Sequence, residues 1–216
     1  MNTDLKEFGK ELYKAAQLPL SWLLSAERLC AAAEAIIAHE LPSEKPYFEA
    51  YAIAQKEAAA KAYAAGNEGG VAEIRAIPPN YPPAQLLYAY AIENALKGLI
   101  VANTPALIEE RKLSDALKSH DLIKLAEKAA FAVHPQERPV LEALSELSIW
   151  AGRYPVALSR REHVGAPVPD ELLDYGSAHP VMRRFFKRAR EELEGRLPRP
   201  IGSRFGALVV MRQPGT

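Results

Sequence analysis

Apolar residues recur every three or four positions along most of this chain, and prolines separate the segments in which they do so. In residues 19–41 they form one stripe: Trp22, Leu23, Ala26, Leu29, Cys30, Ala33, Ile36 and Ile37. Residues three and four apart share one face of a helix, so the stripe predicts an amphipathic helix. Pro42 is expected to stop it, because proline breaks a helix interior. The chain is predicted to be all-α.

The same spacing predicts the other helices. They span residues 4–17, 47–65, 84–103, 114–133, 135–151 and 180–195. Gly-Gly and four prolines between 67 and 83 exclude a regular helix there. We therefore expect N-terminal helices in 1–66, which complete or cover a helical bundle in 84–195 after a connection in 67–83. An irregular tail should follow in 196–216, with 207–211 as a strand or extended segment. Residues 153–179 show no sustained period.

Charge is unevenly distributed along a chain whose formal net charge is zero. Residues 181–216 hold nine Lys or Arg and three acids, whereas residues 1–180 hold 18 basic and 24 acidic residues. The basic end could contact a polyanion or dock on the acidic remainder. Arg184 and Arg188 are the candidate polyanion contacts, with a solvated helix face as the alternative.

Composition also limits the class of protein. One cysteine permits no intramolecular disulfide. The charged N-terminus lacks the apolar core of a signal peptide, and no apolar run approaches the ~20 residues of a membrane span. We expect a cytoplasmic protein that does not enter a membrane. No phosphate-binding loop, dinucleotide fingerprint or His/Cys cluster occurs, so neither a cofactor nor a metal is expected.

Three groups of polar residues interrupt the apolar helices. Glu93 and Lys97 stand four apart in an otherwise apolar segment. They suit an exposed pair worth a few tenths of a kcal/mol. Alternatively, they are buried and need a partner, because a charge in a core must be compensated.

His120 and Asp121 open the next predicted helix. Ser114 or Ser119 could cap that helix, and Asp121 in its first turn would complement the helix dipole, which leaves His120 a packing role. The functional alternative is an imidazole that acts as acid, base or phosphate contact.

Arg153 and Tyr154 follow Gly152 at the end of the 135–151 helix. The guanidinium of Arg153 could neutralise the last helix carbonyls. It could instead bind a phosphate with its two-pronged donor geometry.

The order Glu-x-x-x-Lys, Ser-His-Asp-Leu and Arg-Tyr-Pro across residues 86–155 resembles the HEPN superfamily of helical domains. The resemblance implies a HEPN-like bundle, a homodimer that pairs through the motif-bearing helices, and His120 near Glu93 and Lys97. HEPN ribonucleases carry an Arg five to seven positions before a His, and none of the five histidines here has one.

Two functions follow from the resemblance and from this departure. We expect a protein that binds RNA, a nucleotide or a protein partner in a prokaryotic defence or toxin–antitoxin setting, without HEPN ribonuclease chemistry. Glu93, Lys97, Asp121, Tyr154, Arg184 and Arg188 are the candidate binding residues. The alternative is a metal-independent ribonuclease in which His120 and Arg153 are catalytic.

Overall fold

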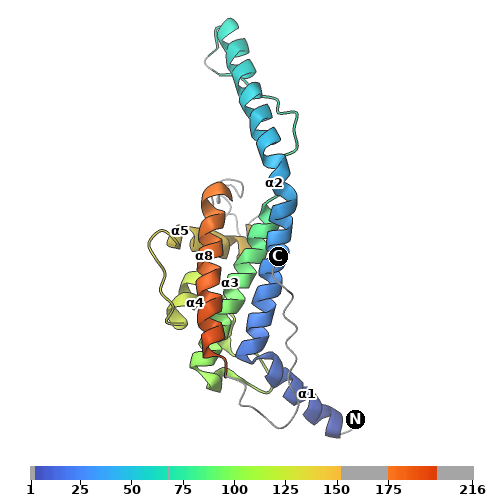
Figure 1. Ribbon diagram of the computed structural model, residues 1–216, viewed down its shortest axis with the longest axis vertical. Helices are drawn as coiled ribbons and strands as arrows, with labels where there is room; N and C mark the ends of the chain where they lie inside the picture. The colour runs from blue at the N-terminus through green and yellow to red at the C-terminus, as the bar shows by residue number, and fades with distance from the viewer. Residues whose placement is uncertain (1–2, 68, 152–174, 199–216) are drawn as a thin grey trace.

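The computed structural model describes residues 3–67, 69–151 and 175–198. This part of the chain is helical and contains no strand, which confirms the all-α prediction. The helices are α1 (Thr3–Ala16), α2 (Pro19–Ala64), α3 (Pro82–Asn103), η1 (Pro105–Leu107), η2 (Asp115–Leu117), α4 (Leu122–Lys128), α5 (Arg138–Glu146), the π-helical turn η3 (Leu147–Ala151) and α8 (Tyr175–Arg196). Figure 1 shows a bundle of α3, α4, α5 and α8 with the first half of α2, from which the second half of α2 projects.

Helix α3 forms the centre of the bundle. It begins at Pro82, two residues before the predicted start at 84, because proline suits the first turn of a helix. Most of its side chains are buried, including Tyr88, Ile92, Leu96 and Leu99. A helix that is apolar on nearly all sides must be covered all round. Helices α2, α8 and α4 supply that cover.

Gly98 allows α3 to lie close to both α2 and α8. A Cβ atom at this position would lie 2.5 Å from Leu193 Cδ2 and 3.0 Å from Trp22 Cβ. Leu193 is fully buried, so its side chain has little room to move aside. Three helices therefore converge at one residue that has no side chain.

The prediction that Pro42 stops the first long helix is wrong, since α2 continues through Pro42 and Pro46 to Ala64. Each proline removes one backbone donor and so frees the carbonyl four residues earlier. These carbonyls belong to Ala38 and Pro42. Both residues are exposed, so water can bind to the two carbonyl oxygens. The Ser43 hydroxyl also donates to the Glu40 carbonyl at 2.7 Å. Proline is tolerated here because this stretch of helix is solvated.

Residues 42–80 form an arm that projects from the bundle (Figure 1). After Gly66 the chain runs back along α2 without regular structure, which confirms the predicted break. The returning segment is tied to α2 where Asn80 N donates to Glu40 Oε2 at 2.9 Å and Tyr81 Oη donates to Glu44 Oε2 at 3.0 Å. The arm thus consists of a helix that is covered on one side by an irregular segment of the chain.

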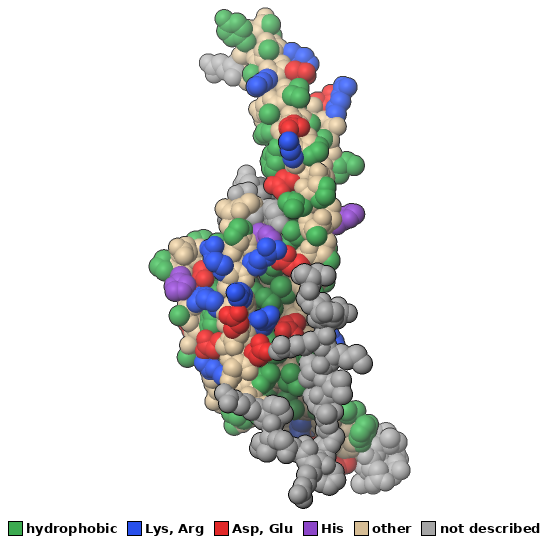
Figure 2. Space-filling model, in the orientation of Figure 1, with side chains coloured by type: hydrophobic (Ala, Val, Ile, Leu, Met, Phe, Trp, Pro, Cys, Tyr) green, Lys and Arg blue, Asp and Glu red, His purple; other side chains and the backbone are tan. Residues whose placement is uncertain are grey.

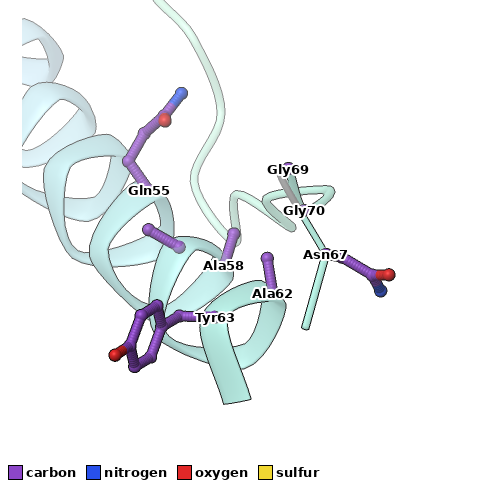
Figure 3. Close-up of a pocket in the computed structure, with 8 residues that line it drawn as sticks. Gln55, Ala58, Ala62, Tyr63, Asn67, Gly69 and Gly70 are labelled. Atoms are coloured by element: carbon purple, nitrogen blue, oxygen red, sulfur yellow. The ribbon is translucent and has the colours of Figure 1, made fainter. Parts of the chain in front are cut away.

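Small residues make that cover possible. Ala54, Ala58 and Ala62 lie buried beneath the returning segment. A Cβ atom on Gly70 would lie 2.5 Å from the Ala58 carbonyl oxygen. Figure 3 shows Ala58 and Ala62 on the side of α2 that faces the two glycines of this turn, whereas Tyr63 points away from them.

The predicted helix over 114–133 is shorter in the structure. It consists of the single turn η2, an extended connection and α4, which begins at Leu122. Asp121 caps α4 by accepting a hydrogen bond from Lys124 N at 3.0 Å, and this requires an extended backbone at Asp121. Ala130, with φ +52°, lies just beyond the other end of α4.

The last two predicted helices also differ at their ends. The 135–151 helix becomes α5 followed by the π-helical turn η3, and α8 begins at Tyr175 rather than at Pro180. The segment 152–174 and the predicted strand or extended tail at 207–211 lie outside the described residues.

Candidate functional site

A buried ion pair on α3 forms the core of the candidate site. Glu93 and Lys97 are one helical turn apart, and Lys97 Nζ lies 2.6 Å from Glu93 Oε1. Their side chains are only 8% and 6% exposed, so the alternative of a surface pair is wrong. A buried carboxylate is costly unless it is paired and hydrogen-bonded. Lys97 neutralises Glu93 and leaves its second oxygen available.

His120 binds that second oxygen. Its Nδ1 lies 2.9 Å from Glu93 Oε2, so the expected proximity of His120 to Glu93 and Lys97 is found in the structure. The His120 side chain is 40% exposed, in contrast to its two partners. We call Glu93, Lys97 and His120 the Glu93 cluster. It connects a buried charge pair to one solvent-accessible imidazole.

The backbone on either side of His120 is fixed by hydrogen bonds. Asp121 N donates to Ser119 Oγ at 3.1 Å, and Leu122 N donates to Ser145 Oγ of α5 at 3.0 Å. The first is a local side-chain-to-backbone contact of the kind found just before a helix, and the second ties the start of α4 to α5. The imidazole is therefore held in position by α3, α5 and the start of α4.

The contact with Glu93 also defines the chemistry of His120. A carboxylate only accepts hydrogen bonds, so Nδ1 carries the proton and Nε2 is the second, outward nitrogen. Nε2 makes no hydrogen bond to any described residue. It accepts a proton when the ring is neutral and donates a hydrogen bond when the ring is charged. Nε2 can therefore form a hydrogen bond with a hydroxyl group or with a phosphate oxygen.

Asp121, a candidate binding residue, acts as a helix cap. Burial would raise the pKa of Asp121, but hydrogen bonds from the backbone and side chain of Lys124 lower it below its usual value. Lys124 Nζ lies 2.9 Å from the Asp121 carboxylate. Arg153 and Tyr154 lie outside the described residues, so their convergence with His120 stays a prediction.

The basic residues of α8 contact acidic partners in the bundle. Arg183 forms two hydrogen bonds with Glu34 of α2, and Arg188 Nη2 lies 2.7 Å from Glu137 Oε2. Arg184 is exposed and pairs with no acid in the described part of the chain. Figure 2 shows Lys and Arg interleaved with Asp and Glu on this face. Docking on the acidic remainder thus accounts for Arg183 and Arg188.

Sequence analysis missed a second polar cluster, which is centred on Glu34. His179 Nε2 lies 3.1 Å from Glu34 Oε1, and the hydroxyl of the buried Tyr88 donates to the same oxygen. Burial raises the pKa of Glu34, but hydrogen bonds from Arg183, Tyr88 and His179 outweigh it and lower the pKa to about 2. One signal was present, because Glu34 occurs four residues after Cys30 within an apolar stripe.

In the part of the chain that the structure covers, no group of three or more His, Cys, Asp or Glu side chains has the arrangement to hold a metal ion. Among the described helices, none combines the length and apolar character that a membrane crossing requires. Comparison of the chain with models of known protein families, with curated proteins and with solved structures found no match.

Proposed function

We propose that this protein is a HEPN-like binding protein that takes up a phosphate-bearing ligand, RNA or a nucleotide, at His120. The observation that carries the proposal is the geometry of the Glu93 cluster, in which Glu93 holds Nδ1 and leaves Nε2 free to bind a ligand on a side chain that is 40% exposed. An imidazole fixed in this way contacts an anion without first losing rotational freedom. The resemblance to HEPN domains supports RNA and nucleotides as the ligand class.

Binding is favoured over catalysis by the state of the nearby cations. Cleavage of RNA needs a proton acceptor for the 2′-hydroxyl and a cation at the phosphate, held in register. Lys97 is buried against Glu93, and Lys124 pairs with Asp121. The buried ammonium group of Lys97 is thus not available to a phosphate, and that of Lys124, although exposed, is already paired with a carboxylate. The missing Arg-x(4–6)-His pattern agrees with this view.

The test measures the affinity of the purified protein for a labelled single-stranded RNA and for a labelled nucleotide. His120→Ala should weaken binding about tenfold to a hundredfold, since a hydrogen bond to a charged group is worth about 1.5–3 kcal/mol. His134→Ala is the matched control, because His134 is exposed and remote in sequence from the Glu93 cluster. Equal binding by wild type and His120→Ala would exclude His120 as the contact.

Ribonuclease activity is the second candidate function. The Glu93–His120 pair has the arrangement in which a carboxylate orients a catalytic base through Nδ1. Arg153 would then supply the cation at the phosphate. Cleavage of RNA that disappears in both His120→Ala and Arg153→Ala, with folding intact, would establish this function in place of simple binding.

Two further expectations from the resemblance stay proposals. One is a homodimer that pairs through the motif-bearing helices, and the other is a protein partner in a prokaryotic defence or toxin–antitoxin system. Purification of the protein with its genomic neighbours would test the second. A stable complex that forms without RNA or nucleotide would favour the protein partner over the phosphate-bearing ligand.

A further inference from the structure

The arm carries an apolar face that no described residue covers. Leu41, Phe48 and Tyr63 of α2 are 53%, 55% and 88% exposed. With the exposed Ala52 and Ala59 they follow the spacing 7, 4, 7, 4, which places all five on one side of a helix. At 100° per residue this side lies about a third of a turn around the helix from the buried Ala54, Ala58 and Ala62. We call the five residues the arm stripe.

We propose that the arm stripe binds the same stripe on a second copy of this chain. The two α2 helices would run antiparallel around a two-fold axis that passes between the levels of Ala52 and Ile53. This interface is distinct from the pairing through motif-bearing helices that the HEPN resemblance implies. It also does not depend on the proposed ligand.

Charge complementarity fixes this orientation and register. Glu49 and Lys56 are two turns apart and flank the arm stripe on the same side, and both are exposed. Glu49 Oε1 also lies 3.8 Å from Lys45 Nζ of its own helix, a surface pair of the kind that contributes little. In the antiparallel register, Glu49 of each copy lies level with Lys56 of the other, so that the pair occurs twice. In a parallel, in-register pair, the two-fold axis runs along the helices and places Glu49 and Lys56 of one copy on the opposite side of the interface from those of the other. Opposite charges therefore come together only in the antiparallel arrangement, which favours it over the parallel alternative.

The same register matches the apolar groups by shape. Phe48 of one copy comes level with the hollow of the other that Gln55, Ala59 and Ala62 line together with the glycine turn (Figure 3). Tyr63 comes level with Pro42, next to Leu41, and the small Ala52 lies beside the axis, where the helices must approach closely. The largest exposed side chains of the stripe would each gain a contact.

The length of the arm agrees with this pairing. Residues 42–64 span about 35 Å of helix. In the proposed register the last residue of α2, Ala64, lies level with Leu41 of the second copy, next to the start of the arm at residue 42. Each arm would reach the second bundle and stop there, without overlap.

The decisive experiment reverses charges and then restores them. Sedimentation equilibrium of the full chain should show a dimer. Glu49→Lys or Lys56→Glu should each raise the dimer Kd by about tenfold or more, since two like-charge pairs replace two salt bridges. The double variant Glu49→Lys/Lys56→Glu should return the Kd to within a few-fold of wild type. Circular dichroism checks that helix content is unchanged.

Glu57→Lys is the matched control. It reverses the same charge on the same helix and also places two lysines four residues apart, but it lies off the arm stripe. It should leave the Kd unchanged. A wild-type monomer at 100 µM or so would overturn the proposal. A dimer whose Kd is the same for wild type and Glu49→Lys would also overturn it. The second result would move the dimer contact to the motif-bearing helices.

Cross-linking tests the register itself. Ala52→Cys should give a disulfide-linked dimer on oxidation, because the two Cβ atoms near the axis come close enough to bridge. Ala60→Cys, on another side of the same helix, should give none. Cross-linking of both variants to the same extent would show random collision and reject the register.

Discussion

Arg188 of α8 and Glu137, the residue that precedes α5, form a buried contact in which one guanidinium nitrogen lies 2.9 and 2.7 Å from the two carboxylate oxygens. Glu137 is almost fully buried and also accepts a hydrogen bond from His134 N at 2.9 Å. The Arg188 guanidinium lies 5.0 Å from the centre of the Phe131 ring. Arg188, considered from sequence as a polyanion contact, thus joins α8 to the loop before α5.

Arg188→Ala should therefore destabilise the fold. The variant leaves the Glu137 carboxylate buried without its cation, at a cost on the order of 2–3 kcal/mol after allowance for solvent screening. Urea unfolding measures this loss. Arg184→Ala is the matched control on the same helix and should change stability by less than about 0.5 kcal/mol. Equal effects of the two variants would contradict the assigned role of Glu137.

The Glu93–Lys97 pair predicts a strongly non-additive double-variant result. Lys97→Met should cost about 3–5 kcal/mol, because it leaves a buried carboxylate that only His120 contacts. Glu93→Gln combined with Lys97→Met should cost less than Lys97→Met alone, since no buried charge then remains uncompensated. The free energies of unfolding of the two single variants and the double variant complete the cycle. Additive costs would mean that the two groups do not interact.

Gly98→Ala should destabilise the bundle, although alanine has the better helix propensity. The added methyl group would lie against Leu193 and Trp22, and overpacking of this kind typically costs about 1–3 kcal/mol. Gly9→Ala provides the contrast, because nothing lies within 4 Å of a Cβ atom there. It should stabilise α1 by up to about 1 kcal/mol. The melting temperatures of the two variants distinguish the effect of packing at Gly98 from the effect of helix propensity at Gly9.

Glu34 should make the protein sensitive to acid. The pKa of Glu34 is about 2 in the folded protein, below its value in the unfolded chain. Its contribution to folding stability is therefore complete at a pH above the unfolded pKa and is lost as the pH falls toward 2. Wild type should lose stability more steeply than Glu34→Gln between about pH 5 and pH 2. Urea midpoints across this range provide the measurement. Parallel pH profiles would show that Glu34 is not the titrating group.

Cys30 should react slowly with thiol reagents in the folded protein. Burial raises the pKa of the Cys30 thiol to about 11, against the opposing hydrogen bond from Tyr88, so little thiolate exists at pH 8 or so. Because Cys30 is the only cysteine, a single colorimetric reading reports on it alone. Reaction should become fast in denaturant. Equal rates in folded and unfolded protein would show that the thiol is open to solvent.

The sequence was sufficient to predict the approximate positions of most helices. The spacing of apolar residues predicted the bounds of α1 and α3 closely. The apolar neighbours of Glu93 indicated its burial as one of two alternatives. The continuity of α2 could not be predicted, because proline is tolerated there only through solvation that depends on the three-dimensional arrangement. The Glu34–Arg183 pair joins residues 149 positions apart, and local periodicity contains no information on such a pair.

Because α2 continues through Pro42 and Pro46, a bend near the prolines moves the far end of the helix. Its first half is clamped in the bundle, and its second half extends roughly 27 Å beyond Pro46. Two missing backbone hydrogen bonds make the proline segment the softest point along it. A bend of about 10° at this point displaces the tip by about 5 Å, so small adjustments next to the bundle become large movements at Tyr63.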